Sequence, residues 1–218
     1  MHLVWDWNGT LLNDLDLVVS ATNEAFVRAG GAPISADEHR RRFRRPIAEF
    51  YGEMLGRELT GDGFAELDEV FHACYNAGLP ACALVDDAVG ALRAWPDTQS
   101  LLSMWFHDEL VPAVDRHGLT RHFARVDGQR VRPGGGLIFK AELLAGHLAA
   151  LGVPGEAAVL IGDSVDDADA AAAVGAACVL YSGGFTDAER LRAAGRPVAG
   201  TLLEAVALAE AAVAGLPA

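Results

Sequence analysis

The stretch VWDWNGTLLND, residues 4–14, ends a short apolar run with an Asn-Gly pair. An apolar run bounded by such a turn signal predicts a buried strand that leads into a loop. Similar apolar runs recur at 100–105, 157–163 and 176–182. Helical patterns lie between and after them at 87–95, 108–118, 139–152, 166–176 and 202–215. Strands that alternate with helices of this length predict an α/β fold with a doubly wound parallel sheet.

One region breaks this alternation. From about Asp16 to Ala83 the chain shows only helical patterns, at 15–30, 35–56 and 63–78. We therefore expect an all-helical domain at residues 16–83, inserted into an α/β core made of residues 1–15 and 84–218. In a parallel sheet the ligand crevice lies outside the carboxyl ends of the strands. A domain inserted directly after the first strand would therefore form a cap over that crevice.

Composition and charge narrow the range of partners. The chain is 51% hydrophobic, enough for a packed core, but it has no apolar run of membrane-spanning length and no signal-peptide layout at its start. We expect a soluble cytoplasmic protein without a membrane partner. A formal net charge of −13 repels a phosphate backbone, so nucleic acid is not an expected partner. The three cysteines lack metal-ligand spacing, and the oligomeric state is not indicated.

Asp6 closes the first expected strand and is followed by Gly9 and Thr10. A carboxylate at a strand end suits nucleophilic attack on an electrophile such as phosphorus. The glycine beside it lets backbone N–H groups approach a ligand. An Asx-type turn without any chemistry is the alternative explanation of these residues.

A second acidic group follows the apolar run 157–163. Asp163 and Asp167 would lie on a loop and on the first turn of a helix, close enough to share one hard cation such as Mg²⁺. Helix capping is the alternative, because acidic side chains favour a helix N-terminus. Capping explains one or two of the four aspartates here, which include Asp166 and Asp169, so the cluster predicts a metal site.

Lys140 is the single lysine of the chain, since the other sixteen basic residues are arginines. A compact point charge suits a place where the planar guanidinium does not fit, and chance exposure is the alternative. Ser103, at the end of the second apolar run, can donate its hydroxyl to a phosphate oxygen, although a strand-end serine also serves structural roles.

Taken in chain order, DWNGTL (6–11), LLSMW (101–105), Lys140 and IGDSVDDADAA (161–171) resemble the four motifs of the haloacid dehalogenase-like hydrolase superfamily. The match spans the whole chain. The helical insertion after the first motif is similar to the C1-type cap of the phosphoglycolate phosphatase-like branch. The resemblance implies a Mg²⁺-dependent phosphatase that acts on a small phosphorylated metabolite, such as a phosphoglycolate-like molecule or a sugar phosphate.

The resemblance also implies a role for each motif residue. Asp6 would attack phosphorus and form a phosphoaspartyl intermediate. Mg²⁺ would be held by Asp6, the main-chain carbonyl of Asn8 and Asp163, while Asp167 would support the metal shell and Lys140. Ser103 and Lys140 would bind the phosphoryl oxygens.

Arginines in the expected cap are candidates for contact with the anionic remainder of the substrate. Arg44 and Arg45 are the substrate-binding candidates, in a run that also contains Arg40, Arg41 and Arg42. A solvated helix face is the alternative explanation for most of this run.

Asn8 departs from the family pattern. The family's phosphatases have an aspartate there that protonates the leaving group and later activates water, help that is worth about 10²–10⁴ in rate. The absence of this acid–base group leaves three interpretations open. The enzyme is slow, the acid is supplied by His107 or by the substrate, or deamidation of Asn8 beside Gly9 creates an aspartate after synthesis. A regulatory protein that binds a phosphoryl ligand without effective turnover is the alternative function. A mutase fits Asn8 less well than a hydrolase.

Overall fold

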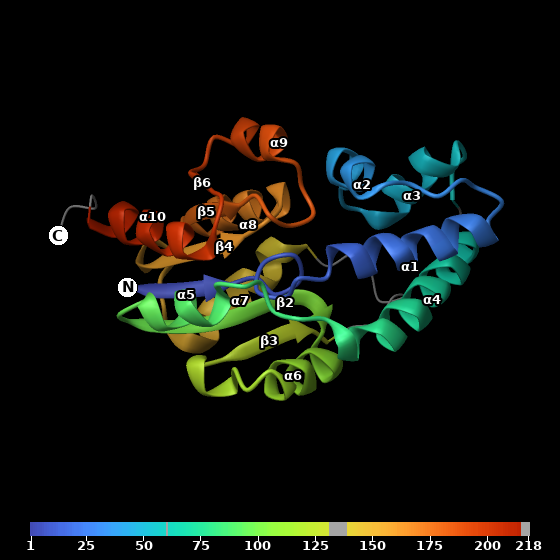
Figure 1. The fold of residues 1–218 in the computed structure, drawn as a ribbon. Coiled ribbons are helices and arrows are strands. Elements are labelled where there is room, and N and C mark those ends of the chain that lie inside the picture. Colours follow the sequence, from blue (N-terminus) through green and yellow to red (C-terminus); the bar gives the residue numbers. More distant parts are fainter. Residues whose placement is uncertain (60, 131–138, 215–218) are drawn as a thin grey trace.

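The computed structural model describes residues 1–59, 61–130 and 139–214, and its centre is a parallel β-sheet (Figure 1). The six strands have the order β3-β2-β1-β4-β5-β6. Their bounds are β1 (His2–Trp5), β2 (Thr98–Phe106), β3 (Val126–Gln129), β4 (Ala158–Gly162), β5 (Ala177–Tyr181) and β6 (Val198–Ala199). All neighbouring strands pair in parallel, which confirms the predicted fold class.

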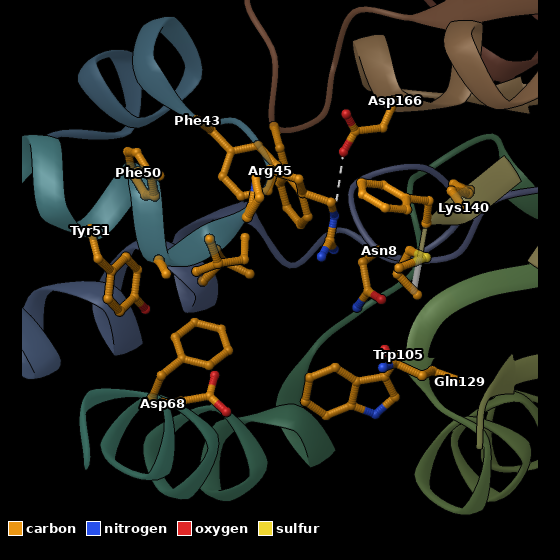
Figure 2. A pocket seen from close by; sticks show the side chains of 18 of the residues that line it. Asn8, Phe43, Arg45, Phe50, Tyr51, Asp68, Trp105, Gln129, Lys140 and Asp166 are labelled. Carbon is orange, nitrogen blue, oxygen red and sulfur yellow. Dashed lines mark ion pairs between the residues drawn. The ribbon is translucent and has the colours of Figure 1, made fainter. Parts of the chain in front are cut away.

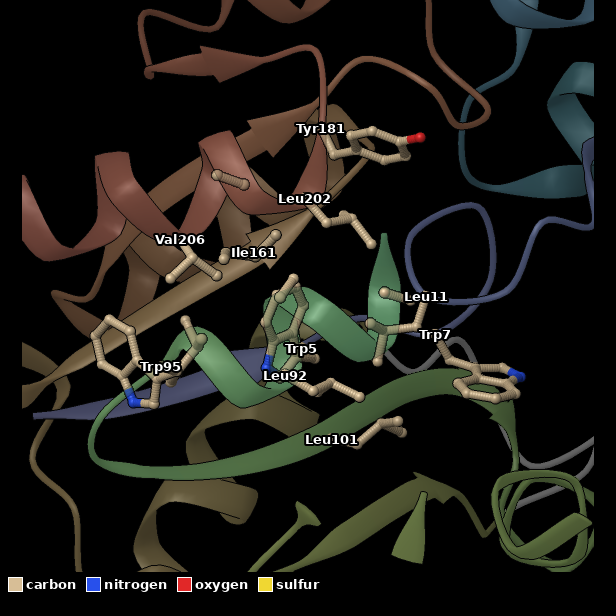
Figure 3. Close-up of a cluster of buried hydrophobic side chains, with 14 of the residues drawn as sticks. Trp5, Trp7, Leu11, Leu92, Trp95, Leu101, Ile161, Tyr181, Leu202 and Val206 are labelled. Atoms are coloured by element: carbon tan, nitrogen blue, oxygen red, sulfur yellow. The ribbon is translucent and has the colours of Figure 1, made fainter. Parts of the chain in front are cut away.

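Helices cover both faces of the sheet. On one face, α5 (Ala88–Ala94), α6 (His107–Arg116) and α10 (Leu202–Ala214) bury apolar side chains in one cluster with Leu3 and Trp5. Figure 3 shows Trp5 in this cluster with Leu92 of α5 and Val206 of α10. On the other face, α7 (Lys140–Leu151), α8 (Val165–Val174) and α9 (Ala188–Ala193) contribute side chains to a second cluster, which includes Val4. Successive side chains of a strand point to opposite faces, so β1 contributes to both cores. In the described part of the chain, no helix combines the length and apolarity needed to cross a lipid bilayer.

Four helices form a separate group between β1 and β2, which we call the helical module. They are α1 (Leu15–Arg28), α2 (Ala36–Arg42), α3 (Ile47–Leu55) and α4 (Gly61–Gly78). The module stands beside the carboxyl ends of the strands, with α1 and α4 side by side (Figure 1). It has a hydrophobic cluster of its own, built around Phe26, Phe50 and Tyr51. A further cluster joins α1 and α4 to Phe185, which follows β5.

The structure departs from the sequence pattern in three places. The helical stretch expected at 35–56 is two helices, because Pro46 lacks an N–H and disfavours helical geometry at Arg45. Strand β3, with the sequence VDGQ, was not predicted because it is short and half polar. Strand β6 has only two residues, Val198 and Ala199, too few for a recognisable pattern.

Candidate active site

The carboxyl ends of β1, β2 and β4 meet at one edge of the sheet. The last residue of β1 pairs with Leu101 of β2 and with Ile161 of β4. The Asp6 N–H donates to the Ile161 carbonyl at 2.9 Å. Ser103 and Asp163 lie two residues beyond these paired positions. The parallel register therefore brings Asp6, Ser103 and Asp163 to the same edge, where open α/β sheets bind ligands.

Lys140, the first residue of α7, lies between two carboxylates. Its Nζ is 2.6 Å from Asp6 Oδ1 and forms a second ion pair with Asp167 Oδ1. Burial on its own would lower the pKa of Lys140, but the Asp167 and Asp6 carboxylates outweigh burial and raise the pKa. Lys140 is therefore a fixed cation beside Asp6, a position that suits it to stabilise charge that develops on a phosphoryl oxygen.

Three buried carboxylates surround this lysine. Asp6, Asp163 and Asp167 offer oxygen atoms that all lie within 4.8 Å of one another. Burial raises the pKa of Asp6 to about 6, although Lys140 opposes the shift. Burial and the charge of Asp6 raise the pKa of Asp163 well above its ordinary value. One lysine does not balance three carboxylates, and this set of oxygen donors fits a hard divalent cation such as Mg²⁺.

Asp167 uses its two oxygens differently. Oδ2 accepts hydrogen bonds from the Ser164 N–H at 3.0 Å and the Ser164 hydroxyl at 2.6 Å. Together with the Asp167 N–H, which points to Ser164 Oγ at 3.3 Å, these contacts form a capping box at the start of α8. Oδ1 faces Lys140. Helix capping and membership of the charged cluster are therefore compatible in one side chain.

Gly9 allows the loop after β1 to approach the cluster. Its φ is +71°, and a Cβ built there would lie 2.5 Å from Asp163 Oδ2. That carboxylate is already fixed, because Oδ2 accepts the Phe185 N–H at 2.6 Å and Oδ1 accepts the Thr10 hydroxyl at 3.1 Å. Any other residue at position 9 would displace Asp163 and strain the backbone.

Asn8 is held by a hydrogen-bond network that sequence reasoning missed. Its Nδ2 donates to Asp14 Oδ2 and to the Tyr75 hydroxyl oxygen, both at 2.9 Å. Tyr75 donates to the same Asp14 oxygen at 2.6 Å, and the Gly9 N–H donates to Asp14 Oδ1 at 2.8 Å. On its other side, Asn8 Oδ1 accepts from Ser103 Oγ at 3.1 Å.

This network fixes the orientation of the Asn8 amide. Burial raises the pKa of Asp14, but hydrogen bonds from Tyr75, Asn8 and Gly9 oppose the shift and favour the carboxylate, which is an acceptor only. The amide NH₂ must face Asp14, so Oδ1 faces Ser103 and the site. The Gly9 nitrogen, which would have to attack the Asn8 amide during deamidation, is engaged with Asp14, and this opposes deamidation.

The five arginines of residues 40–45 have different surroundings. Arg45 lies at the edge of the site, with its Nε 3.4 Å from Asp166 Oδ2 (Figure 2). Arg44 and Arg42 both form ion pairs with Glu53 of α3. Neither is among the described residues that line the hollow beside Asp6. Arg40 donates to the carbonyls of Gly183 and Gly184, and Arg41 is exposed.

A cavity of about 750 Å³ lies between the helical module and the strand ends. Figure 2 shows Asn8 and Lys140 on its core side, with Phe50 and Tyr51 facing them from α3. A smaller hollow of about 40 Å³ touches Asp6, Ser103 and Asp163. His107 is not among the described residues that line either space; its Nδ1 accepts the Gly128 N–H at 3.2 Å instead.

A parallel α/β fold with a buried lysine–aspartate cluster at its strand ends is the arrangement expected above for a haloacid dehalogenase-like hydrolase. Residues 1–175 match the family model of haloacid dehalogenase-like hydrolases, and the chain belongs to this family.

Relatives agree with this assignment. The chain is 24% identical to a phosphoglycolate phosphatase of Chromobacterium violaceum, over 88% of this chain and 89% of that protein. It is similar in fold to a haloacid dehalogenase-like family protein from Streptococcus pneumoniae, with a TM-score of 0.82, 18% identity, and 95% and 97% of the two chains covered. A predicted phosphoglycolate phosphatase from Haemophilus somnus gives a TM-score of 0.74 at 16% identity, with 95% and 96% covered.

Proposed function

We propose that this protein is a Mg²⁺-dependent phosphatase that hydrolyses a small phosphate monoester through a phosphoaspartyl intermediate on Asp6. The observation that carries the proposal is the meeting of Asp6, Lys140, Asp163 and Asp167 at the carboxyl ends of the strands. The family match and the relative from Chromobacterium violaceum support it.

In the first step, an Asp6 oxygen attacks phosphorus as the bond to the alcohol oxygen breaks. Lys140 neutralises charge on the phosphoryl oxygens. The departing alkoxide takes a proton from solvent water, because the Asn8 amide has none to give at neutral pH. Mg²⁺, held by Asp6, Asp163, Asp167 and the main-chain oxygen of Asn8, would supply additional positive charge at the transferring phosphoryl group.

In the second step, water attacks the phosphoaspartate, the Asp6 carboxylate leaves, and the water proton passes to a phosphate oxygen. Asn8 is positioned to help by accepting a hydrogen bond. When the Ser103 hydroxyl turns from Asn8 Oδ1 to a phosphoryl oxygen, that amide oxygen becomes a free acceptor that can orient the attacking water. Asp14 and Tyr75 act as positioning residues, because they fix which end of the amide faces the site.

The helical module acts in this proposal as a cap over the strand ends, with the domain boundaries expected above. The cavity enclosed between module and core supports that role. Arg45 is the arginine placed to contact the bound ester, since it lines both the cavity and the smaller hollow. For Arg44 a substrate contact would require release from Glu53.

The test is phosphate release from a panel of phosphate monoesters, in Mg²⁺ and in excess chelator. The proposal expects release in Mg²⁺ that chelator abolishes and that the Asp6→Asn variant lacks. Stoichiometric binding of a phosphoryl ligand without release would support the regulatory alternative, and release that persists in Asp6→Asn would overturn the nucleophile.

A further inference from the structure

We propose that the alcohol part of the substrate is large, uncharged and apolar, with a ring or chain on the order of ten carbon atoms. The proposal rests on the function proposed above and names the substrate class of that site. It comes from the shape and chemistry of the cavity between the helical module and the strand ends.

The cavity and the reacting centre are continuous. Asn8, Lys140 and Arg45 line both the cavity of about 750 Å³ and the hollow beside Asp6. A phosphoryl group held against Asp6 in the hollow therefore leaves the rest of the ester pointing into the cavity. A volume of this size is typical of pockets that enclose drug-sized ligands, and it greatly exceeds a two-carbon alcohol.

Several aromatic side chains line the cavity but not the hollow beside Asp6. Phe50 and Tyr51 come from α3, Phe64 and Phe71 from α4, and Trp105 from the end of β2. Figure 2 shows Phe50, Tyr51 and Trp105 around the cavity. Neighbouring rings support each other: the centroids of Tyr51 and Phe64 are 6.0 Å apart. Rings packed in this way give a preformed apolar wall, which favours apolar and aromatic ligands.

The charges that line the cavity disfavour a second anionic group on the substrate. Among the described lining residues, the two permanent cations are each engaged: Lys140 with Asp6 and Asp167, and Arg45 with Asp166. The wall also contains the Asp68 carboxylate, 3.5 Å from His72. The described lining has three carboxylates, Asp68, Asp166 and Asp169, and its two permanent cations both lie at the end beside Asp6, where they also line the hollow. A carboxylate deep in the cavity would therefore meet negative charge. An alcohol part that carries no charge fits better.

The test is a series of esters that share one kind of leaving group. Ethyl, butyl and 3-phenylpropyl phosphate all release a primary alcohol, so differences in kcat/KM report binding of the carbon chain. We expect kcat/KM to rise roughly threefold for each buried methylene, and 3-phenylpropyl phosphate to exceed phosphoglycolate at least about 30-fold. A flat series, or a preference for phosphoglycolate, would overturn the proposal while leaving the phosphatase function intact.

A variant that fills part of the cavity tests where the carbon chain of the ester binds. Ala48 of α3 lines the cavity and is partly exposed, so Ala48→Phe fills space without opening the protein core. It should lower kcat/KM for 3-phenylpropyl phosphate at least about tenfold and leave ethyl phosphate within about twofold. Ala65→Phe, on an exposed position of α4, is the matched control and should change neither. Equal losses on both esters in Ala48→Phe would contradict the assignment.

Binding of non-hydrolysable phosphonates separates the two proposals. Calorimetric titration with 3-phenylpropylphosphonate and with methylphosphonate needs no turnover. Tighter binding of the larger phosphonate, lost in Ala48→Phe, supports the substrate class even if no ester is hydrolysed. Equal binding of the two phosphonates would refute the substrate class whatever the outcome for phosphate release.

Discussion

The floor and the wall of the cavity differ in origin and in chemistry. The floor is the buried charged cluster at the hollow that opens into the cavity: Asp6 and Asp163 directly follow strands β1 and β4, and Lys140 and Asp167 lie in the first turns of helices α7 and α8. The wall consists of aromatic side chains, half of them on α3 and α4 of the helical module. On the two proposals above, this difference means that reaction type and substrate choice reside in separate parts of the molecule. Changes in the floor should affect all substrates, and changes in the wall should affect them selectively.

The largest expected effect comes from the floor. Asp6→Asn keeps the shape of the side chain but removes the nucleophile, so phosphate release should fall by about 10³ or more for every ester. Asp62→Asn, at an exposed position in the first turn of α4 that lines neither the cavity nor the hollow, is the matched control and should stay within about twofold of the native rate. A loss limited to one ester would show that Asp6 acts in binding rather than in chemistry.

Substitution of Lys140 should cause the next largest loss of activity. Lys140→Ala leaves Asp6 and Asp167 without their buried partner, which is expected to lower kcat by about 10²–10³ and stability in chelator by about 3–5 kcal/mol. Lys140→Arg should not restore activity, because the planar guanidinium does not fit a place built for a point charge. Kinetics and urea unfolding measure both effects. Full rescue by arginine would contradict this view of the floor.

Asn8 and Asp14, which lie beside the floor, test the hydrogen-bond network that orients the Asn8 amide. Asn8→Asp places a second carboxylate at hydrogen-bond distance from Asp14, which should destabilise the fold by about 1–3 kcal/mol. Adding Asp14→Asn exchanges the two groups and should restore stability. The double variant should also release phosphate up to about 10²-fold faster than the native protein, because position 8 then carries an acid–base group. Additive stability losses in the double variant would disprove the pairing.

The smallest effect concerns the wall at low pH. His39 is buried against Phe43 and Phe50, and burial, helped by Arg40, lowers its pKa to about 4. A depressed pKa in the folded state means that stability is present above the unfolded pKa of about 6.5 and declines as pH falls toward 4. Between pH 7.5 and 5 the native protein should lose about 2 kcal/mol more than His39→Leu. Equal losses would show that His39 does not titrate in this way.

The sequence predicted the floor better than the wall, for a physical reason. Asp6 and Asp163 each follow an apolar strand directly, and the parallel register brings strand ends together. The Asp14–Tyr75 contact joins residues 61 positions apart, and no local pattern predicts it. The wall likewise depends on tertiary packing and on the break before α3 at Pro46, so the size of the cavity was not foreseen.

The most direct test of the central claim is peptide mass analysis after rapid acid quenching of the enzyme with Mg²⁺ and either ethyl or 3-phenylpropyl phosphate. The account predicts one added phosphoryl group on the peptide that contains Asp6 with both esters, formed faster with the larger one, and none in Asp6→Asn. A phosphoryl group on another residue, or turnover without any modified peptide, would contradict the claim that the floor carries the chemistry for every substrate.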